Sequence, residues 1–299
     1  MGDLSQSFDE PTDIRPFLRW AGSKRKLLRH LIPFIPKSFN KYYEPFLGGG
    51  SMFFYLGPKR AEISDASLPL IQTYRAVADS PDEMLKFLRP LKPSKANFYR
   101  LRQYAPRIAA NAGAQFIFLN KSCWNGLYRV NSNGIFNVPY GSPKTDGIID
   151  EENFIRCSTQ LRRREISIKC QGFDKIETRV CEGDFIFLDP PYVTSHNMNG
   201  FVDWNENLFS WADQVRLAAM ARRLVAKKAN VLITNAAHED IRELYADFGQ
   251  SEFQRSTTLA SDISRRGKTS EAIFFGGPAY NVEWALNRGV EDGRESRAY

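Results

Sequence analysis

The sequence predicts an α/β chain in which a mainly parallel β-sheet carries helices on both faces. Short apolar runs, mostly without polar alternation, recur towards both ends of the chain, as expected for strands covered on both sides. Helical patterns lie between these runs. The middle differs, because residues 70–119 are almost wholly helical in pattern. We therefore expect a helical module inserted into a split α/β domain.

Five apolar runs are the predicted strands. They are residues 42–46, 61–65, 185–189, 231–235 and 272–275. Each is short, as strands in a covered sheet are.

Three helices are predicted from their start and stop signals. Residues 24–32 carry leucine and isoleucine on one face, and this helix should stop at Pro33. Ser80 precedes Pro-Asp-Glu, which has the form of a capping box with proline at the first helical position. Ser210 can cap a helix whose apolar stripe includes Leu217 and Leu224.

Composition excludes several classes of protein. The 299 residues are 42% hydrophobic and 25% charged with a net charge of +7, which is typical of a globular chain and permits a nucleic-acid partner. No apolar run approaches the roughly 20 residues that cross a bilayer, and the acidic start does not resemble a secretory signal. We therefore expect a cytoplasmic protein without a membrane partner. Four cysteines without a CxxC pair and three histidines predict no metal site and no disulfide framework.

The expected domains follow from this organisation. Residues 1–69 and 155–285 form the split α/β domain, and residues 70–154 form the inserted module. Within the module, residues 120–146 are rich in Asn, Gly, Ser and Pro, which favours a hairpin or an ordered loop. Residues 286–299 form a polar tail.

A glycine cluster follows the first predicted strand. Glu44-Pro-Phe-Leu-Gly-Gly-Gly-Ser51 can turn sharply and let a cofactor approach the backbone. Asp65 ends the next strand, where a carboxylate can accept hydrogen bonds from both hydroxyls of a ribose. The phosphate-binding pattern GxxxxGK[ST] is absent, which argues against a P-loop nucleotidase. An ordinary strand-to-helix turn explains the glycines equally well.

A second cluster combines a carboxylate, two prolines and an aromatic ring. Four apolar residues bring Asp189 to a strand end, and Pro190, Pro191 and Tyr192 follow. Prolines have no N–H, so the local carbonyls can accept from a ligand. Asp189 and the Pro190 carbonyl can accept the two hydrogens of an amino group on a flat heterocycle, while Tyr192 stacks on that ring. The alternative is a strand that ends in a proline turn with aspartate as a cap.

Together, these motifs resemble the Dam-type DNA adenine methyltransferases of the alpha group. The resemblance rests on FLRWAGSK at residues 17–24, EPFLGGGS at 44–51, NGLYRVN at 125–131, FNVPYG at 136–141 and DPPY at 189–192, in that order. It covers residues 17–277. The resemblance implies a seven-stranded Rossmann-like methyltransferase sheet, an inserted target-recognition module, S-adenosyl-L-methionine as cofactor, and methyl transfer to N6 of adenine in double-stranded DNA.

The resemblance also implies roles for individual residues. The cofactor-binding positions are Trp20, Lys24, Phe46, Gly48, Gly50, Asp65, Phe173 and Asp189. The DNA-binding positions are Arg19, Trp124, Asn125, Leu127 and Arg129. A ring at position 124 can fill the stack where the target adenine leaves it, and the Arg129 fork can read guanine O6 and N7. Catalysis is expected to rest on Asp189, Pro190, Pro191 and Tyr192, largely through positioning. Residues 193–209 are expected to close over the base as a flap.

Two departures and two alternatives accompany this interpretation. In the family, an Arg-Tyr-Lys type segment that touches DNA commonly follows FNVPYG, whereas here Ser142-Pro143-Lys144 follows. We expect GATC or a related recognition site, and this departure concerns its outer bases. Gly172 replaces a carboxylate before Phe173, so the contact there is expected to use the backbone. A cytosine-N4 methyltransferase would use the same aspartate, and a non-catalytic DNA-binding relative would keep the fold alone. The protein is expected to act as a monomer.

Overall fold

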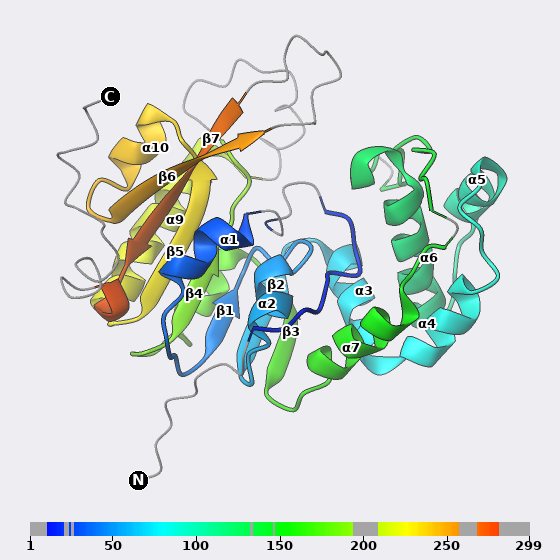
Figure 1. Cartoon of the computed structure of the whole chain (residues 1–299), viewed down its shortest axis with the longest axis horizontal. Coiled ribbons are helices and arrows are strands. Elements are labelled where there is room, and N and C mark those ends of the chain that lie inside the picture. The colour runs from blue at the N-terminus through cyan, green and yellow to red at the C-terminus, as the bar shows by residue number, and fades with distance from the viewer. Residues whose placement is uncertain are drawn as a thin grey trace. The chain divides into compact units, whose positions relative to one another are not determined.

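A computed structural model describes residues 11–20, 24, 27–131, 134–145, 147–193, 209–256 and 268–280 (Figure 1). Its seven-stranded sheet has the strand order β3-β2-β1-β4-β5-β7-β6. The strands are β1 (Tyr42–Glu44), β2 (Ala61–Asp65), β3 (Ile166–Cys170), β4 (Phe185–Leu188), β5 (Asn230–Ala236), β6 (Gly249–Ser256) and β7 (Lys268–Gly276). The predicted α/β fold with a seven-stranded sheet is confirmed.

Strand pairing is parallel in one part of the sheet and antiparallel at one end. The pairs β2–β3, β1–β4 and β4–β5 are parallel. The pairs β5–β7 and β6–β7 are antiparallel. The carboxyl ends of β1, β4 and β5 therefore meet at one edge, which is where ligands bind in open α/β sheets.

All five predicted strands are present, but two further strands were not predicted. These are β3 and β6, which lie at the two ends of the strand order. Every residue of β3 is only partly buried, and β6 has the polar sequence GQSEFQRS. An edge strand has a neighbouring strand on one side only and is more exposed to solvent. It therefore lacks the continuous apolar run that marks the inner strands.

The described residues fall into two compact units. One contains residues 29–46 and 173–280, and the other contains residues 11–28 and 47–172. This division groups β2 and β3 with the helices, whereas the predicted functional domains keep them with the rest of the sheet. The predicted domain boundaries remain a prediction.

The first unit holds the core of β4, β5 and β7. Phe187, Leu232 and Phe274 are at most 1% exposed. Helix α9 (Trp211–Ala226) contacts β5, and the short helix α10 (Glu239–Leu244) precedes β6 (Figure 1). The predicted Ser210 cap is confirmed: its hydroxyl accepts from the Asp213 N–H, and the Asp213 side chain accepts from the Ser210 N–H.

The second unit confirms the helical middle of the chain. After α2 (Ser51–Leu56) come α3 (Leu68–Asp79), α4 (Pro81–Leu88), α5 (Lys95–Gln103), α6 (Ala109–Ser122) and α7 (Glu151–Leu161). Helix α6 contacts α3, α4 and α5 (Figure 1). The described part of residues 120–146 forms an ordered loop with isolated bridges between Cys123 and Tyr140 and between Val130 and Phe136, as predicted.

Two helix ends differ from prediction. The Ser80 side chain caps nothing, although α4 begins at Pro81 as predicted. Ser80 is the single residue between α3 and α4, and its backbone serves both: its N–H bonds to Ala76 and its carbonyl accepts from Met84. The helix predicted for residues 24–32 is only α1 (Leu28–Leu31), extended by the 3-10 turn Ile32–Phe34. Pro33 lies in the first turn of that 3-10 helix, where its missing N–H costs nothing.

Candidate functional site

Asp189 follows β4 directly, and its carboxylate is held by the neighbouring strand. The Thr234 hydroxyl of β5 donates a 2.6 Å hydrogen bond to Asp189 Oδ1. Thr234 is fully buried, whereas Asp189 is only partly buried. Short hydrogen bonds to a carboxylate are strong, so this contact fixes how the Asp189 group is turned.

Tyr192 is anchored through its hydroxyl. It donates a 2.9 Å hydrogen bond to Glu271 Oε2 on β7, and Glu271 is itself buried. Burial raises the pKa of Tyr192, as do the negative charges of Asp189 and Glu271, while a hydrogen bond with Thr234 acts in the opposite direction. Tyr192 is therefore a neutral donor at physiological pH.

The two prolines differ in what their carbonyls do. Gln214 of α9, which is fully buried, donates from Nε2 to the Pro191 carbonyl at 3.2 Å. The Pro190 carbonyl accepts no hydrogen bond from any described residue. The Pro191 carbonyl, which was expected to stay open to a ligand, is therefore already bonded to the protein, whereas the role of the Pro190 carbonyl towards a ligand stays a prediction.

The glycine cluster turns the chain between β1 and α2. Gly48 and Gly50 have φ of +48° and +67°, a region that favours glycine. The Gly48 N–H donates to Asp65 Oδ2 at 3.1 Å, and the Tyr74 hydroxyl donates to the Gly48 carbonyl at 3.0 Å. A side chain at Gly48 would meet the Trp20 ring at 2.8 Å, and one at Gly50 would meet the Tyr74 hydroxyl at 2.8 Å. In the structure it is the protein's own rings that approach this backbone closely.

Trp20 contacts both the glycine turn and two aromatic rings of the second unit. Its ring is stacked on Tyr128 at 5.9 Å and on Phe116 at 6.4 Å between centroids. The same ring lies against Gly48. A movement of the half-buried Trp20 ring would therefore disturb these stacking contacts.

Two charged side chains of the second unit differ in exposure, because Lys24 is buried and Asp65 is half-buried. Lys24 is 4% exposed. Asp65 accepts backbone N–H groups on both oxygens, from Ser67 at 2.9 Å and from Gly48 at 3.1 Å. Burial raises the pKa of Asp65, and these backbone hydrogen bonds counteract it.

The remaining predicted cofactor residues, Phe46 and Phe173, contact each other in the first unit. Their rings are stacked with centroids 5.5 Å apart, and Phe209 meets both edge-on. The Arg216 guanidinium lies 5.5 Å from the Phe173 centroid. Phe173 is thus enclosed by protein side chains, and its role towards a cofactor stays a prediction.

Arg19 and the predicted DNA-binding loop lie together because of Asn120. Asn120 Oδ1 accepts from the Arg19 N–H at 2.9 Å, while Asn120 Nδ2 donates to the Arg19 carbonyl at 2.6 Å and to the Gly126 carbonyl at 3.1 Å. Gly126 has φ of +65°, and a side chain there would come within 2.6 Å of Arg19 Cβ. The Arg19 backbone and the turn that follows Trp124 are thereby locked together.

The other DNA-binding candidates lie on this loop. Trp124 and Asn125 belong to the 3-10 turn Trp124–Gly126 and are exposed, Trp124 by 39%. Leu127 is partly buried, and its carbonyl accepts from the Cys123 thiol. Arg129 is exposed, and its Nε donates to Asn137 Oδ1 at 2.8 Å. This bond orients the guanidinium while leaving its two Nη groups without a hydrogen-bond partner among the described residues.

The loop rests on α5 within a basic, acid-free part of the chain. Phe98 of α5 is fully buried, 5.5 Å from the Tyr140 ring and 6.3 Å from the Phe136 ring. Between Glu83 and Asp146 the sequence has no acidic residue and ten basic ones: Lys86, Arg89, Lys92, Lys95, Arg100, Arg102, Arg107, Lys121, Arg129 and Lys144. This composition favours a polyanionic partner.

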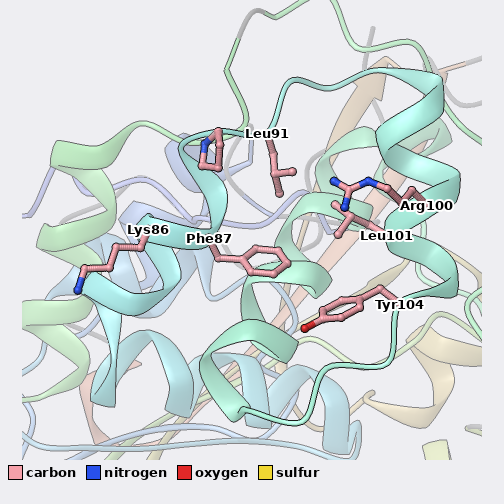
Figure 2. A pocket seen from close by; sticks show the side chains of 7 residues that line it. Lys86, Phe87, Leu91, Arg100, Leu101 and Tyr104 are labelled. Carbon is pink, nitrogen blue, oxygen red and sulfur yellow. The ribbon is translucent and has the colours of Figure 1, made fainter.

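A cavity of about 310 Å³ lies elsewhere, between α4 and α5 (Figure 2). It is lined by Lys86, Phe87, Pro90, Leu91, Arg100, Leu101 and Tyr104. None of the predicted site residues lines this cavity. Over the described ranges, no three or more His, Cys, Asp or Glu side chains are grouped to hold a metal ion. None of the helices in the described part combines the length and apolarity needed to cross a membrane.

Several contacting residues were not predicted from the sequence. Thr234 and Asn235 end a predicted strand, and Glu271 lies one residue before another, so their places at strand ends were a usable signal. Asn120 and Gln214 carried no such signal, because each reaches its partners from a helix through the tertiary fold.

Comparisons with known proteins identify the family of the chain. Residues 20–259 match the family model described as D12 class N6 adenine-specific DNA methyltransferase. The chain is 34% identical to the type II methyltransferase M1.LlaDCHI of Lactococcus lactis subsp. cremoris, over 87% of this chain and 95% of that protein. It is 34% identical to the type II methyltransferase M.MjaIII of Methanocaldococcus jannaschii, over 79% and 89% of the two chains. It is also 29% identical to a DNA adenine methylase of Serratia marcescens, over 87% and 97%. Adenine rather than cytosine is thus the base that the family modifies, and the chain belongs to the D12 class of N6 adenine-specific DNA methyltransferases.

Proposed function

We propose that this enzyme moves a methyl group from S-adenosyl-L-methionine to N6 of an adenine flipped out of duplex DNA. The observation that carries the proposal is the pair of acceptors after β4. The Asp189 carboxylate is held by Thr234, and the adjacent Pro190 carbonyl accepts from no described residue. An exocyclic amine has two N–H groups, and this pair can accept both.

The residues of the second unit fit the proposed cofactor. Asp65 accepts from the backbone of Gly48, Ser67 and Ala66, and a carboxylate has about four lone-pair positions, so capacity remains for a ribose hydroxyl. The buried Lys24 ammonium suits the carboxylate of the methionine end. Trp20 lies against the Gly48 backbone, where a flat ring can pack. Phe46, Gly50 and Phe173 remain predicted contacts, as does Asp189 on the cofactor side.

S-adenosyl-L-methionine supplies an electrophilic methyl group on a sulfonium. The protein's task is then to make the amine a better nucleophile, because its lone pair is delocalised into the adenine ring. Asp189 and the Pro190 carbonyl hold the two N–H bonds, which favours a tetrahedral nitrogen with its lone pair directed out of the ring plane. The Tyr192 ring stacks on the flipped base, which is worth about 1–3 kcal/mol.

The proposed DNA contacts lie on the loop of the second unit. The exposed Trp124 ring fills the space that the flipped adenine leaves, and Asn125 and Leu127 line the same turn. The oriented Arg129 fork reads guanine. Arg19, locked to this turn through Asn120, contacts the outer part of the site. We propose GATC or a related sequence as the target, in a cytoplasmic protein that works as a monomer. The predicted flap, residues 193–209, lies almost wholly outside the described residues.

Labelled cofactor tests the donor, the base and the site in one experiment. The enzyme is incubated with tritiated S-adenosyl-L-methionine and plasmid DNA, and the DNA is then digested to nucleosides. We expect label in N6-methyl-2′-deoxyadenosine only, and sequencing of the modified plasmid should place it in one short motif. Label in N4-methyl-2′-deoxycytidine, or none in DNA, would refute the proposal.

The Asp189→Ala variant tests the catalytic assignment. It should lose methyl transfer while still binding duplex DNA, because the amine loses its charged acceptor. A rate within about tenfold of the parent, which is about 1.4 kcal/mol, would contradict the role of Asp189.

A further inference from the structure

We propose that Thr234 and Gln214 are positioning residues that hold the Asp189–Tyr192 motif from the two faces of β5. Thr234 sets the orientation of the Asp189 carboxylate directly. Gln214, supported by Asn235, fixes the Pro191 carbonyl from the other side. The inference rests on the proposed role of Asp189 and extends it to residues that do not touch the substrate.

Thr234 is the centre of the contacts on one face. Its hydroxyl donates to Asp189 Oδ1 at 2.6 Å. Glu271 accepts from the Tyr192 hydroxyl at 2.9 Å. Ala236 is paired with Glu271 across β5 and β7, so Thr234 and Glu271 are diagonal neighbours on the same face. A β-branched side chain in a strand has few rotamers, so the Thr234 hydroxyl points in one direction.

Asn235 lies on the opposite face, because successive strand residues alternate. Its Nδ2 donates to Gln214 Oε1 at 3.2 Å, and Gln214 Nε2 donates to the Pro191 carbonyl at 3.2 Å. Asn235 and Gln214 are both fully buried. Buried amides that make such bonds are costly to replace and fix one geometry. The peptide group between Pro191 and Tyr192 is thereby held, while the Pro190 carbonyl accepts from none of the described residues.

These two sets of bonds define where the two proposed acceptors lie. One acceptor is the Asp189 carboxylate, turned by Thr234, and the other is the Pro190 carbonyl, held by the bond one residue later. Misplacement of reacting groups by about 1 Å can lower a rate about 100-fold. Loss of either contact should therefore lower the rate of methyl transfer without weakening binding.

Single-turnover methylation by the full chain tests this inference. Thr234→Val removes the hydroxyl and keeps the shape, and Gln214→Leu removes the amide. Each should lower the rate at saturating duplex and cofactor by about 10- to 100-fold, with both dissociation constants changed less than about threefold. Thr234→Ser should restore the rate to within about threefold. Should Thr234→Val not fold, Thr234→Cys takes its place, because a thiol of similar size is a weak donor.

Thr73→Val is the matched control. Thr73 is a buried threonine of α3 whose hydroxyl donates to the Pro69 carbonyl at 2.8 Å, so the same change is made in the other unit. Its rate should stay within about threefold of the parent. The inference is overturned if Thr234→Val turns over like this control, if the losses appear in binding alone, or if serine fails to rescue. If Asp189→Ala also retains activity, the proposed function fails too, whereas an inactive Asp189→Ala beside a fully active Thr234→Val overturns only this inference.

Discussion

Adding one methyl group at Gly48 tests how tightly the glycine turn is packed. At this residue φ is +48°, where a non-glycine residue costs about 1–2 kcal/mol. The new Cβ would also lie 2.8 Å from Trp20 Cδ1. Because Trp20 is stacked on Tyr128 and Phe116, its ring cannot move without losing those contacts. Overpacking of this kind costs about 1–3 kcal/mol more.

Gly134 offers the matched control for this change. It has φ of +73°, and apart from its chain neighbours no described residue lies within 4 Å of the position where its Cβ would be. Gly134→Ala should therefore lower the free energy of unfolding by only the cost of the left-handed backbone, about 1–2 kcal/mol. Gly48→Ala should lower it by about 2–5 kcal/mol, because overpacking adds to that cost. Urea unfolding measures both, and calorimetry should show weaker cofactor binding for Gly48→Ala alone. Equal destabilisation of the two variants, with unchanged cofactor affinity, would refute the packing argument.

Three further predictions concern DNA reading, pH and the ring stack. Arg129→Ala should weaken the free energy of binding by about 1–3 kcal/mol on the preferred duplex and by much less on duplexes altered at the guanine. Lys95→Ala should instead weaken binding to every duplex and make the log–log slope of affinity against salt shallower by about 0.9. A uniform loss for Arg129→Ala would make Arg129 a phosphate or structural contact. Burial, together with the neighbouring Arg19 charge, lowers the pKa of Lys121 to about 8. The folded state thus disfavours the ammonium form, so the parent should gain stability as pH rises from about 8 towards the ordinary value of 10.5. Lys121→Met should lack that gain. If urea unfolding gave the same dependence of stability on pH for the parent and the variant, this prediction would be contradicted. Tyr128→Ala should weaken cofactor binding because Trp20 loses a stacking partner, although Tyr128 is not itself a predicted cofactor residue. Calorimetry that showed the parent's cofactor affinity for this variant would argue against that coupling.

Local sequence signals identified the inner part of the sheet. The run at residues 185–188 is a strand of four buried apolar residues, so composition alone marks it. The Ser210 cap was predictable for a similar reason, because a helix start depends on a few adjacent residues. The edge strands β3 and β6 were not, because a strand with one free side tolerates polar residues.

The sequence by itself determined the family, the class of reaction and the residue types of the reacting motif. Asp189, Pro190 and Tyr192 are adjacent in the chain, so their combination can be recognised without coordinates. Only the tertiary structure decided what holds them. Thr234 and Gln214 are 45 and 23 residues from Asp189 and Pro191, and their hydrogen bonds exist because β5 pairs with β4 and α9 lies beside β5. A hydrogen bond needs its two atoms within about 3 Å, and for residues far apart in sequence that distance is set by strand register and helix packing.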